Sequence, residues 1–110
     1  MRRFNDTILN DSSITGDSTG ETVELESIYG FSLQIRSDAT SGGSGVLKVQ
    51  VSNDGESWTE LSSPTATITG GLTVQMLNIA DTFYDKMRIF YDHTAGTVDS
   101  IVVVINGKGV

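Results

Sequence analysis

Residues 45–61, GVLKVQVSNDGESWTEL, constrain the fold of this chain more than any other stretch. Leu47, Val49 and Val51 alternate with polar residues, which is the period of a strand with one buried face. Residues 53–55, Asn-Asp-Gly, form a turn signal because Asn and Asp tolerate positive φ and Gly has no Cβ. Trp58 then lies at the start of the strand that returns from this turn. The sequence therefore predicts a β-hairpin.

The same two-residue alternation recurs along the chain, at residues 23–25, 31–35, 65–69, 72–76 and 87–91. After Met76 the phase slips by one, to Leu77 and Ile79, which predicts a bulge or a strand that crosses between sheets. Residues 81–86 are the one place that could form a helical turn. About eight short strands predict an all-β fold, a two-sheet antiparallel β-sandwich of jelly-roll or immunoglobulin-like type.

A chain of 110 residues is expected to form one domain. Residues 1–20 are polar and hold few apolar anchors, so we expect an N-terminal arm or extended segment there, followed by a single β-sandwich domain at residues 21–110. Residues 101–105, IVVVI, are consecutive and apolar. They predict a strand that is covered on both faces or buried in a subunit contact.

The chain carries 14 acidic and 7 basic residues, a net charge of −7. This charge repels a phosphate backbone, so we expect no nucleic-acid partner. No apolar run has the length of a signal peptide or a membrane span, which predicts a protein made in the cytoplasm and not inserted in a membrane. The chain contains no cysteine, so disulfides and thiolate metal sites are excluded.

The residues that could carry chemistry are few. His93 is the single histidine and lies in a polar stretch, and no serine sits in a nucleophile motif, so we predict no catalytic residue and no enzymatic activity. One histidine without cysteine cannot make a zinc site. Calcium is an open alternative if loop aspartates converge, but acidic loop residues are commonly turn formers, and we expect no metal and no cofactor. The aspartates in question are Asp38, Asp54, Asp81, Asp85, Asp92 and Asp99.

The order of segments resembles small virion proteins of tailed bacteriophages. The matching segments are YGFSLQIR (29–36), a glycine-rich loop, the 45–61 hairpin, a threonine-rich strand and residues 86–109, KMRIFYDHTAGTVDSIVVVINGKG. The resemblance implies a capsid decoration or cement protein on the virion exterior, without enzymatic activity. It implies binding to the major capsid protein or another virion protein, as a symmetric homo-oligomer. A trimer is favoured because it matches a three-fold lattice position.

The predicted partner-binding residues are Arg2, Arg3 and Phe4, a basic tip that could dock on an acidic coat surface. Two alternatives stay open. One is a tail, neck or fibre component of the virion. The other is a carbohydrate-binding sandwich, because residues 52–58, SNDGESW, resemble the strand-turn-strand of discoidin-like modules. In that case Tyr84, Tyr91 or Trp58 would stack on sugar rings.

Overall fold

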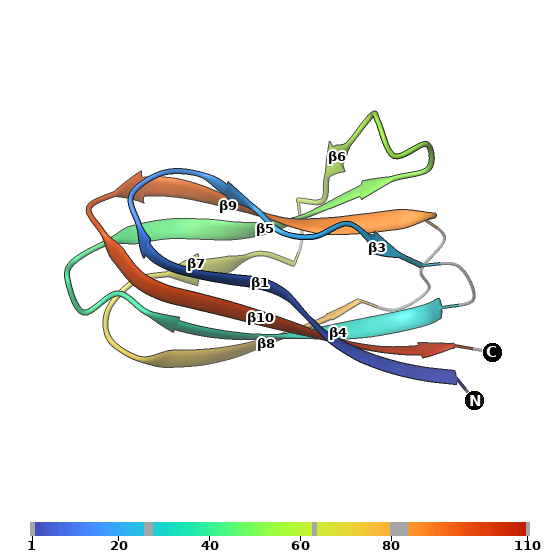
Figure 1. The fold of residues 1–110 in the computed structure, drawn as a ribbon, viewed down its shortest axis with the longest axis horizontal. Helices are drawn as coiled ribbons and strands as arrows, with labels where there is room; N and C mark the ends of the chain where they lie inside the picture. The colour runs from blue at the N-terminus through green and yellow to red at the C-terminus, as the bar shows by residue number, and fades with distance from the viewer. Residues whose placement is uncertain (1, 26–27, 63, 80–83, 110) are drawn as a thin grey trace.

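The computed structural model describes residues 2–25, 28–62, 64–79 and 84–109, and these form two antiparallel sheets packed face to face (Figure 1). One sheet has four strands in the order β1-β10-β4-β8. Their bounds are β1 (Arg2–Ile14), β10 (Val98–Gly109), β4 (Ile28–Asp38) and β8 (Thr73–Ile79). No helix occurs among the described residues, and the predicted all-β sandwich is confirmed.

The other sheet has six strands along the path β2-β9-β5-β6, with β3 also on β9 and β7 also on β5. Their bounds are β2 (Ser18–Thr19), β3 (Val23–Glu24), β5 (Ser44–Ser52), β6 (Thr59–Glu60), β7 (Ala66–Ile68) and β9 (Lys86–Ala95). The described chain thus has ten strands where about eight were predicted. If β2 with β3 and β6 with β7 each count as one interrupted strand, each sheet has four strands, and their order is that of a jelly roll.

The core lies between the sheets and is built by the predicted alternation. Leu47 and Val49 of β5 face Leu33 and Ile35 of β4 across it, all fully buried. In β10, Ile101, Val103 and Ile105 of the IVVVI stretch are also fully buried. Val102 and Val104 point to the outer face and are half-buried. Within this chain the IVVVI strand is therefore covered on one face only.

β8 departs from the prediction. Its register against β4 is regular, with no bulge, and Leu77 and Ile79 pack against the core. Val74 and Met76, which the alternation suggested as core residues, point outward and are each 55% exposed. The predicted slip inside the strand was wrong, because the chain changes sheets earlier, at the turn around Gly70 (φ 77°) between β7 and β8.

The inward positions of β8 are partly polar, which hid its true phase in the sequence. Gln75 points toward the interior, and its Nε2 donates a hydrogen bond to the Thr67 carbonyl oxygen of β7 at 2.8 Å. The amide is thus satisfied where a hydrophobic residue was expected. The bond also joins β7 and β8 across the open side of the sandwich.

The N-terminal segment supplies two strands. β1 pairs with β10 along its length, and Ile8, Leu9 and Ile14 are buried. The register shifts between Thr7 and Leu9, so that both Ile8 and Leu9 reach the core at this bulge. Residues 1–20, expected as an arm or extended segment, therefore lie along the sandwich from residue 2 onward.

The predicted helical turn at residues 81–86 falls mostly outside the described residues. Residues 80–83 are among those that the structure does not describe. Lys86 is already the first residue of β9. The last residue of the predicted helical turn is therefore part of a β-strand.

Candidate functional site

The pairing of β1 with β10 gathers basic residues at one end of the four-stranded sheet. Arg2 lies opposite Gly109, Arg3 opposite Lys108 and Phe4 opposite Gly107 in the register. The two chain ends accordingly lie side by side (Figure 1). This corner, defined as Arg2, Arg3 and Lys108, holds three of the seven basic residues of a chain whose net charge is −7.

Lys108 was not recognised as part of this site from the sequence. It stands more than a hundred positions from Arg3, and only the ladder between the first and last strands brings the two backbones together. No local signal marks such a pairing, because strand order is set by the packing of the whole sandwich. The structure thus places the predicted partner-binding residues Arg2, Arg3 and Phe4 on an edge strand, with Lys108 opposite Arg3 in the ladder.

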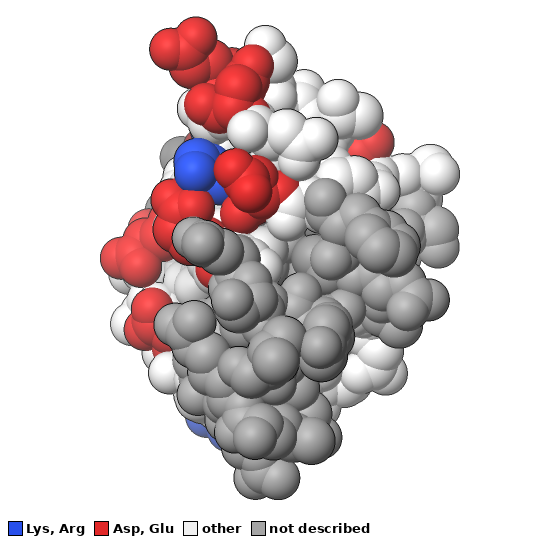
Figure 2. Space-filling model, turned by 90° about the vertical axis from the view of Figure 1, so that its right-hand side faces the viewer, with Lys and Arg blue, Asp and Glu red and all other residues white. Residues whose placement is uncertain are grey.

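Acidic side chains gather at the same end of the molecule as the two termini (Figure 1 and Figure 2). Figure 2 shows Asp and Glu residues gathered over one side and the top of one end of the molecule. Glu24 belongs to the acidic set and pairs with Lys86, Oε2 to Nζ at 2.8 Å, with 65% of the glutamate side chain exposed. Such exposed pairs contribute little to stability. The strand ends that carry Arg2, Arg3 and Lys108 therefore lie at an end of the molecule where many acidic side chains are exposed (Figure 2).

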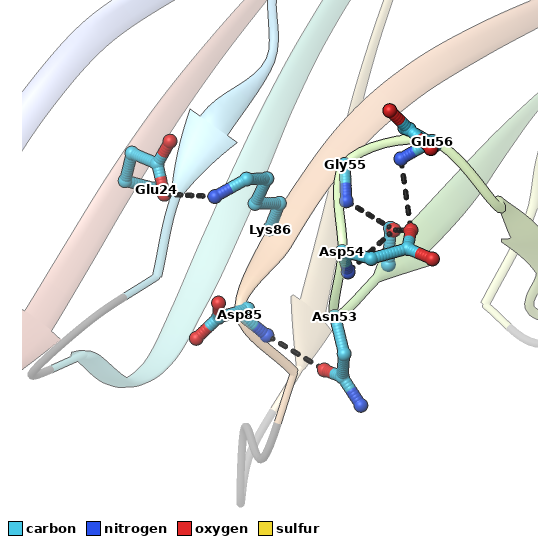
Figure 3. Close-up of polar contacts among 8 residues, drawn as sticks. Glu24, Asn53, Asp54, Gly55, Glu56, Asp85 and Lys86 are labelled. Atoms are coloured by element: carbon cyan, nitrogen blue, oxygen red, sulfur yellow. Dashed lines mark hydrogen bonds and ion pairs between the residues drawn. The ribbon is translucent and has the colours of Figure 1, made fainter.

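The 52–57 turn is held by several hydrogen bonds between its own residues (Figure 3). Ser52 Oγ accepts hydrogen bonds from the amides of Asp54 and Gly55 at 3.2 and 2.9 Å. Asp54 Oδ1 accepts from the amides of Glu56 and Ser57, each at 2.8 Å. These amides of Ser57 and Glu56, with the Ser52 hydroxyl, lower the pKa of Asp54 from 3.8 to about 2. The predicted Asn-Asp-Gly turn is confirmed, and Asp54 acts as its anchor.

A groove lies beside this turn. It has a volume of about 430 Å³ and is lined by residues of β5, the turn and β6, together with Tyr84, which is 38% exposed. Asn53 Oδ1 accepts a hydrogen bond from the Asp85 amide at 3.0 Å, so the turn is tied to the segment before β9 (Figure 3). This hydrogen bond connects the turn, which lines the groove, with the segment that contains Tyr84.

The three aromatic residues suggested for sugar stacking differ in their surroundings. Tyr91 is fully buried, and burial raises the pKa of its hydroxyl. Its ring therefore cannot stack on a sugar. Trp58 has one ring face covered by the Arg88 guanidinium, whose Cζ lies 4.2 Å from the ring centroid. Tyr84 remains the exposed aromatic residue of the three.

His93 lies in β9, not in the turn where the sequence suggested it. Its Nδ1 is 2.9 Å from the Tyr91 hydroxyl, and its Nε2 is 2.8 Å from the Gly96 carbonyl oxygen. A carbonyl can only accept, so Nε2 carries a proton, and in the neutral ring Nδ1 then accepts from the tyrosine hydroxyl. Both ring nitrogens are engaged in holding the β9–β10 turn.

The loop aspartates that the structure describes do not gather at one place. Asp38 and Asp99 serve the β4–β5 loop, where they accept hydrogen bonds from Thr40 and from Ser41. Asp54 anchors its own turn, as described above. The remaining positions are split: Asp92 binds Lys48 Nζ at 3.0 Å, Asp85 precedes β9, and Asp81 lies outside the described residues. Within the described part of the chain, no three acidic or histidine side chains form a group that could hold a metal ion.

Comparison with known proteins relates the fold to solved structures of low sequence identity. Neither a family model nor a curated protein matches the chain. Among solved structures, the SPBc2 prophage-derived protein YomS superposes with a TM-score of 0.60 and 13% identity, over 96% of this chain and 92% of YomS. A subunit of the disulfide-linked pili of Bacillus endospore appendages superposes with a TM-score of 0.57 and 11% identity, over 98% and 88% of the two chains. At these identities the likeness establishes a shared fold.

The structure also bears on membrane insertion. No helix among the described residues has the length and apolar character needed to span a bilayer.

Proposed function

We propose that this chain is a non-enzymatic structural protein of a phage-type virion, which binds the outside of the assembled capsid and stabilises it. The observation that carries the proposal is the basic corner of Arg2, Arg3 and Lys108 on an otherwise acidic body. In this proposal the basic corner makes the contact with an acidic surface, and the acidic side chains of the chain stay in solvent. The resemblance to phage virion proteins and the fold shared with a prophage-derived protein support the same role.

The proposed partner is the major capsid protein or another virion protein in its assembled state. A shell offers many identical sites, so a modest interface per copy is sufficient when the copies are linked. Binding to the assembled shell in preference to free subunits shifts the assembly equilibrium toward the shell. This is how a small protein without chemistry of its own stabilises a capsid.

Co-sedimentation with assembled shells tests the proposal. Arg3→Glu should weaken binding by roughly tenfold per copy, since it reverses one contacting charge. Arg36→Glu is the matched control, because it makes the same charge change on an exposed residue of β4 away from the corner, and it should leave binding unchanged. Binding should also fall as salt is raised.

Three outcomes would contradict the capsid role. No binding to shells at low salt would overturn it, and so would equal losses in the two variants. Binding to isolated tails or necks in place of shells would favour the alternative virion position.

The groove beside the 52–57 turn keeps a second function in view. Its exposed Tyr84 offers an aromatic ring face next to polar groups of the turn, a combination used to hold sugars. Retention of the protein on a glycan column, without binding to shells, would favour a carbohydrate-binding module.

A further inference from the structure

β8 is an open edge of the four-stranded sheet. It pairs with β4 on one side, and no other described strand pairs with its outer side. An edge strand presents a row of unpaired N–H and C=O groups, which is a template for another strand. At seven residues, β8 is long enough to form a full ladder with a partner.

This edge lacks the features by which proteins normally protect such strands. β8, TVQMLNI, contains no charged residue, no proline and no bulge. The surrounding twenty residues, 61–80, contain no charged residue at all, although 19% of the chain is charged. The outer strands of the six-stranded sheet are two or three residues long, which protects that sheet by shortness.

Both faces of β8 offer apolar contacts to a neighbour. Val74 and Met76 point outward and are each 55% exposed, and Leu72 just before the strand is 72% exposed. On the inner face, Leu77 and Ile79 are only partly buried, although they pack against the core. An added strand would cover the open side of these two residues and continue the core beyond the edge.

We propose that β8 pairs antiparallel with β8 of a second copy of this chain, about a two-fold axis through Met76. Directly opposite residues of an antiparallel pair point to the same face of the sheet. The two-fold axis must therefore pass midway between the two copies of one residue, which lie opposite each other. Placing it at Met76, the middle of Thr73–Ile79, gives full overlap: Met76 lies opposite Met76, Val74 opposite Asn78, and Gln75 opposite Leu77. The two four-stranded sheets then form one continuous sheet.

The absence of charge along this edge points to a second copy as the occupant. Two molecules of net charge −7 repel each other over most of their surfaces. The edge formed by residues 61–80 is where they can approach without a charged side chain of either copy in the contact. An isologous contact of this kind is the commonest way to build a homodimer. It gives a two-fold pair, in place of the trimer expected from the lattice argument, and it does not depend on the virion role.

A single-cysteine experiment tests the axis. The chain has no cysteine, so Met76→Cys introduces the only thiol, and Met76 is exposed enough to be replaced without disturbing the core. Cβ atoms directly opposite in such a pair are about 4.5–5.5 Å apart, and a disulfide spans about 3.5–4.5 Å, so a shift of the edge strands by about 1 Å brings the two thiols into bonding distance. Mild oxidation should yield a covalent dimer for Met76→Cys.

Val102→Cys is the matched control, on the outer face of the same sheet but on the central strand β10, and it should yield little dimer. Equal cross-linking of both variants would overturn edge pairing. Absence of the Met76→Cys dimer would overturn the axis.

A charge-swap experiment tests the partner. Met76→Lys and Met76→Glu should each raise the dimer dissociation constant at least tenfold, because each places like charges directly opposite one another. An equimolar mixture of the two should dimerise again. Asn10→Lys, on the exposed side of β1 at the opposite edge, should leave the wild-type constant unchanged. Analytical ultracentrifugation gives the constants.

A wild-type protein that stays monomeric overturns the inference, as does a trimer, and as does a mixture that fails to recover. Loss of association in Asn10→Lys would instead show head-to-tail pairing of β8 with β1, which also overturns the two-fold contact. None of these results depends on binding to shells, so the self-contact and the virion role can fail separately.

Discussion

The two edges of the four-stranded sheet, β1 and β8, are built in opposite ways. β1 has thirteen residues, carries both arginines and aspartates, and contains a bulge at which Ile8 and Leu9 are both buried. The carbonyl oxygen of Ile8 accepts a hydrogen bond from the Glu21 amide at 2.9 Å, so the following segment covers this edge. β8 has none of these features, and its outward apolar side chains are exposed.

The difference indicates which edge the chain closes itself and which it leaves for another molecule. A bulge and charged residues prevent a second strand from adding to β1, at the cost of local irregularity. β8 is regular and uncharged, so nothing in its sequence opposes addition. The same sheet therefore has one edge that belongs to the monomer and one that is available for assembly.

The largest expected contrast is in stability. Ile8→Ala should lower the free energy of unfolding by about 2–5 kcal/mol. Ile8 is 1% exposed, so the substitution removes buried apolar atoms and leaves a cavity in the core. Met76→Ala should change it by less than about 0.5 kcal/mol in dilute solution, since Met76 is largely exposed. Urea unfolding monitored by circular dichroism measures both. Similar losses in the two variants would show that β1 and β8 contribute alike to the monomer.

A smaller effect is expected where the chain covers β1. A Cβ added to Gly20 would lie 2.6 Å from the carbonyl oxygen of Ile8, which is a backbone atom and cannot move aside cheaply. Gly20→Ala should therefore destabilise the protein by about 1–3 kcal/mol. Gly16→Ala is the matched control, because nothing lies within 4 Å of the added atom there. If Gly20→Ala were neutral, the cover over β1 would be looser than the hydrogen bond to Glu21 implies.

The sequence was sufficient to predict strands that have one apolar, buried face and one polar, solvent-exposed face. It was not sufficient where a polar side chain points toward the core. The 45–61 hairpin and the strand with Phe31, Leu33 and Ile35 were predicted correctly, because in each of them the buried side chains are all apolar and occur at every second position. β8 was read with the wrong phase, because Gln75 points inward and is satisfied by the Thr67 carbonyl oxygen. That satisfaction depends on β7 lying across the sandwich, which no local pattern encodes.

The candidate site shows the same limit. Arg2, Arg3 and Phe4 stood out as a basic tip, yet the adjacent Lys108 did not, since its proximity follows from the pairing of the first and last strands. Strand order in a jelly roll brings distant segments together, and the contacts that decide it are spread over the whole core. The open edge of β8 likewise becomes visible only when its place in the sheet is known.

The smallest predicted effect distinguishes the hairpin end from the β8 edge by its dependence on pH. Amides of Ser57 and Glu56 hold the pKa of Asp54 at about 2, below its ordinary value of 3.8. A lowered folded pKa means that the stabilisation of the turn is fully present above pH 3.8 and is lost as the pH falls through about 2. β8 holds no titratable group, so its own contacts should be unchanged across this range. Carboxyl chemical shifts measured by NMR should give a midpoint for Asp54 near 2, and this transition should vanish in Asp54→Asn, which keeps an accepting oxygen. A midpoint near 3.8 would mean that the turn in solution does not hold the carboxylate as the structure does.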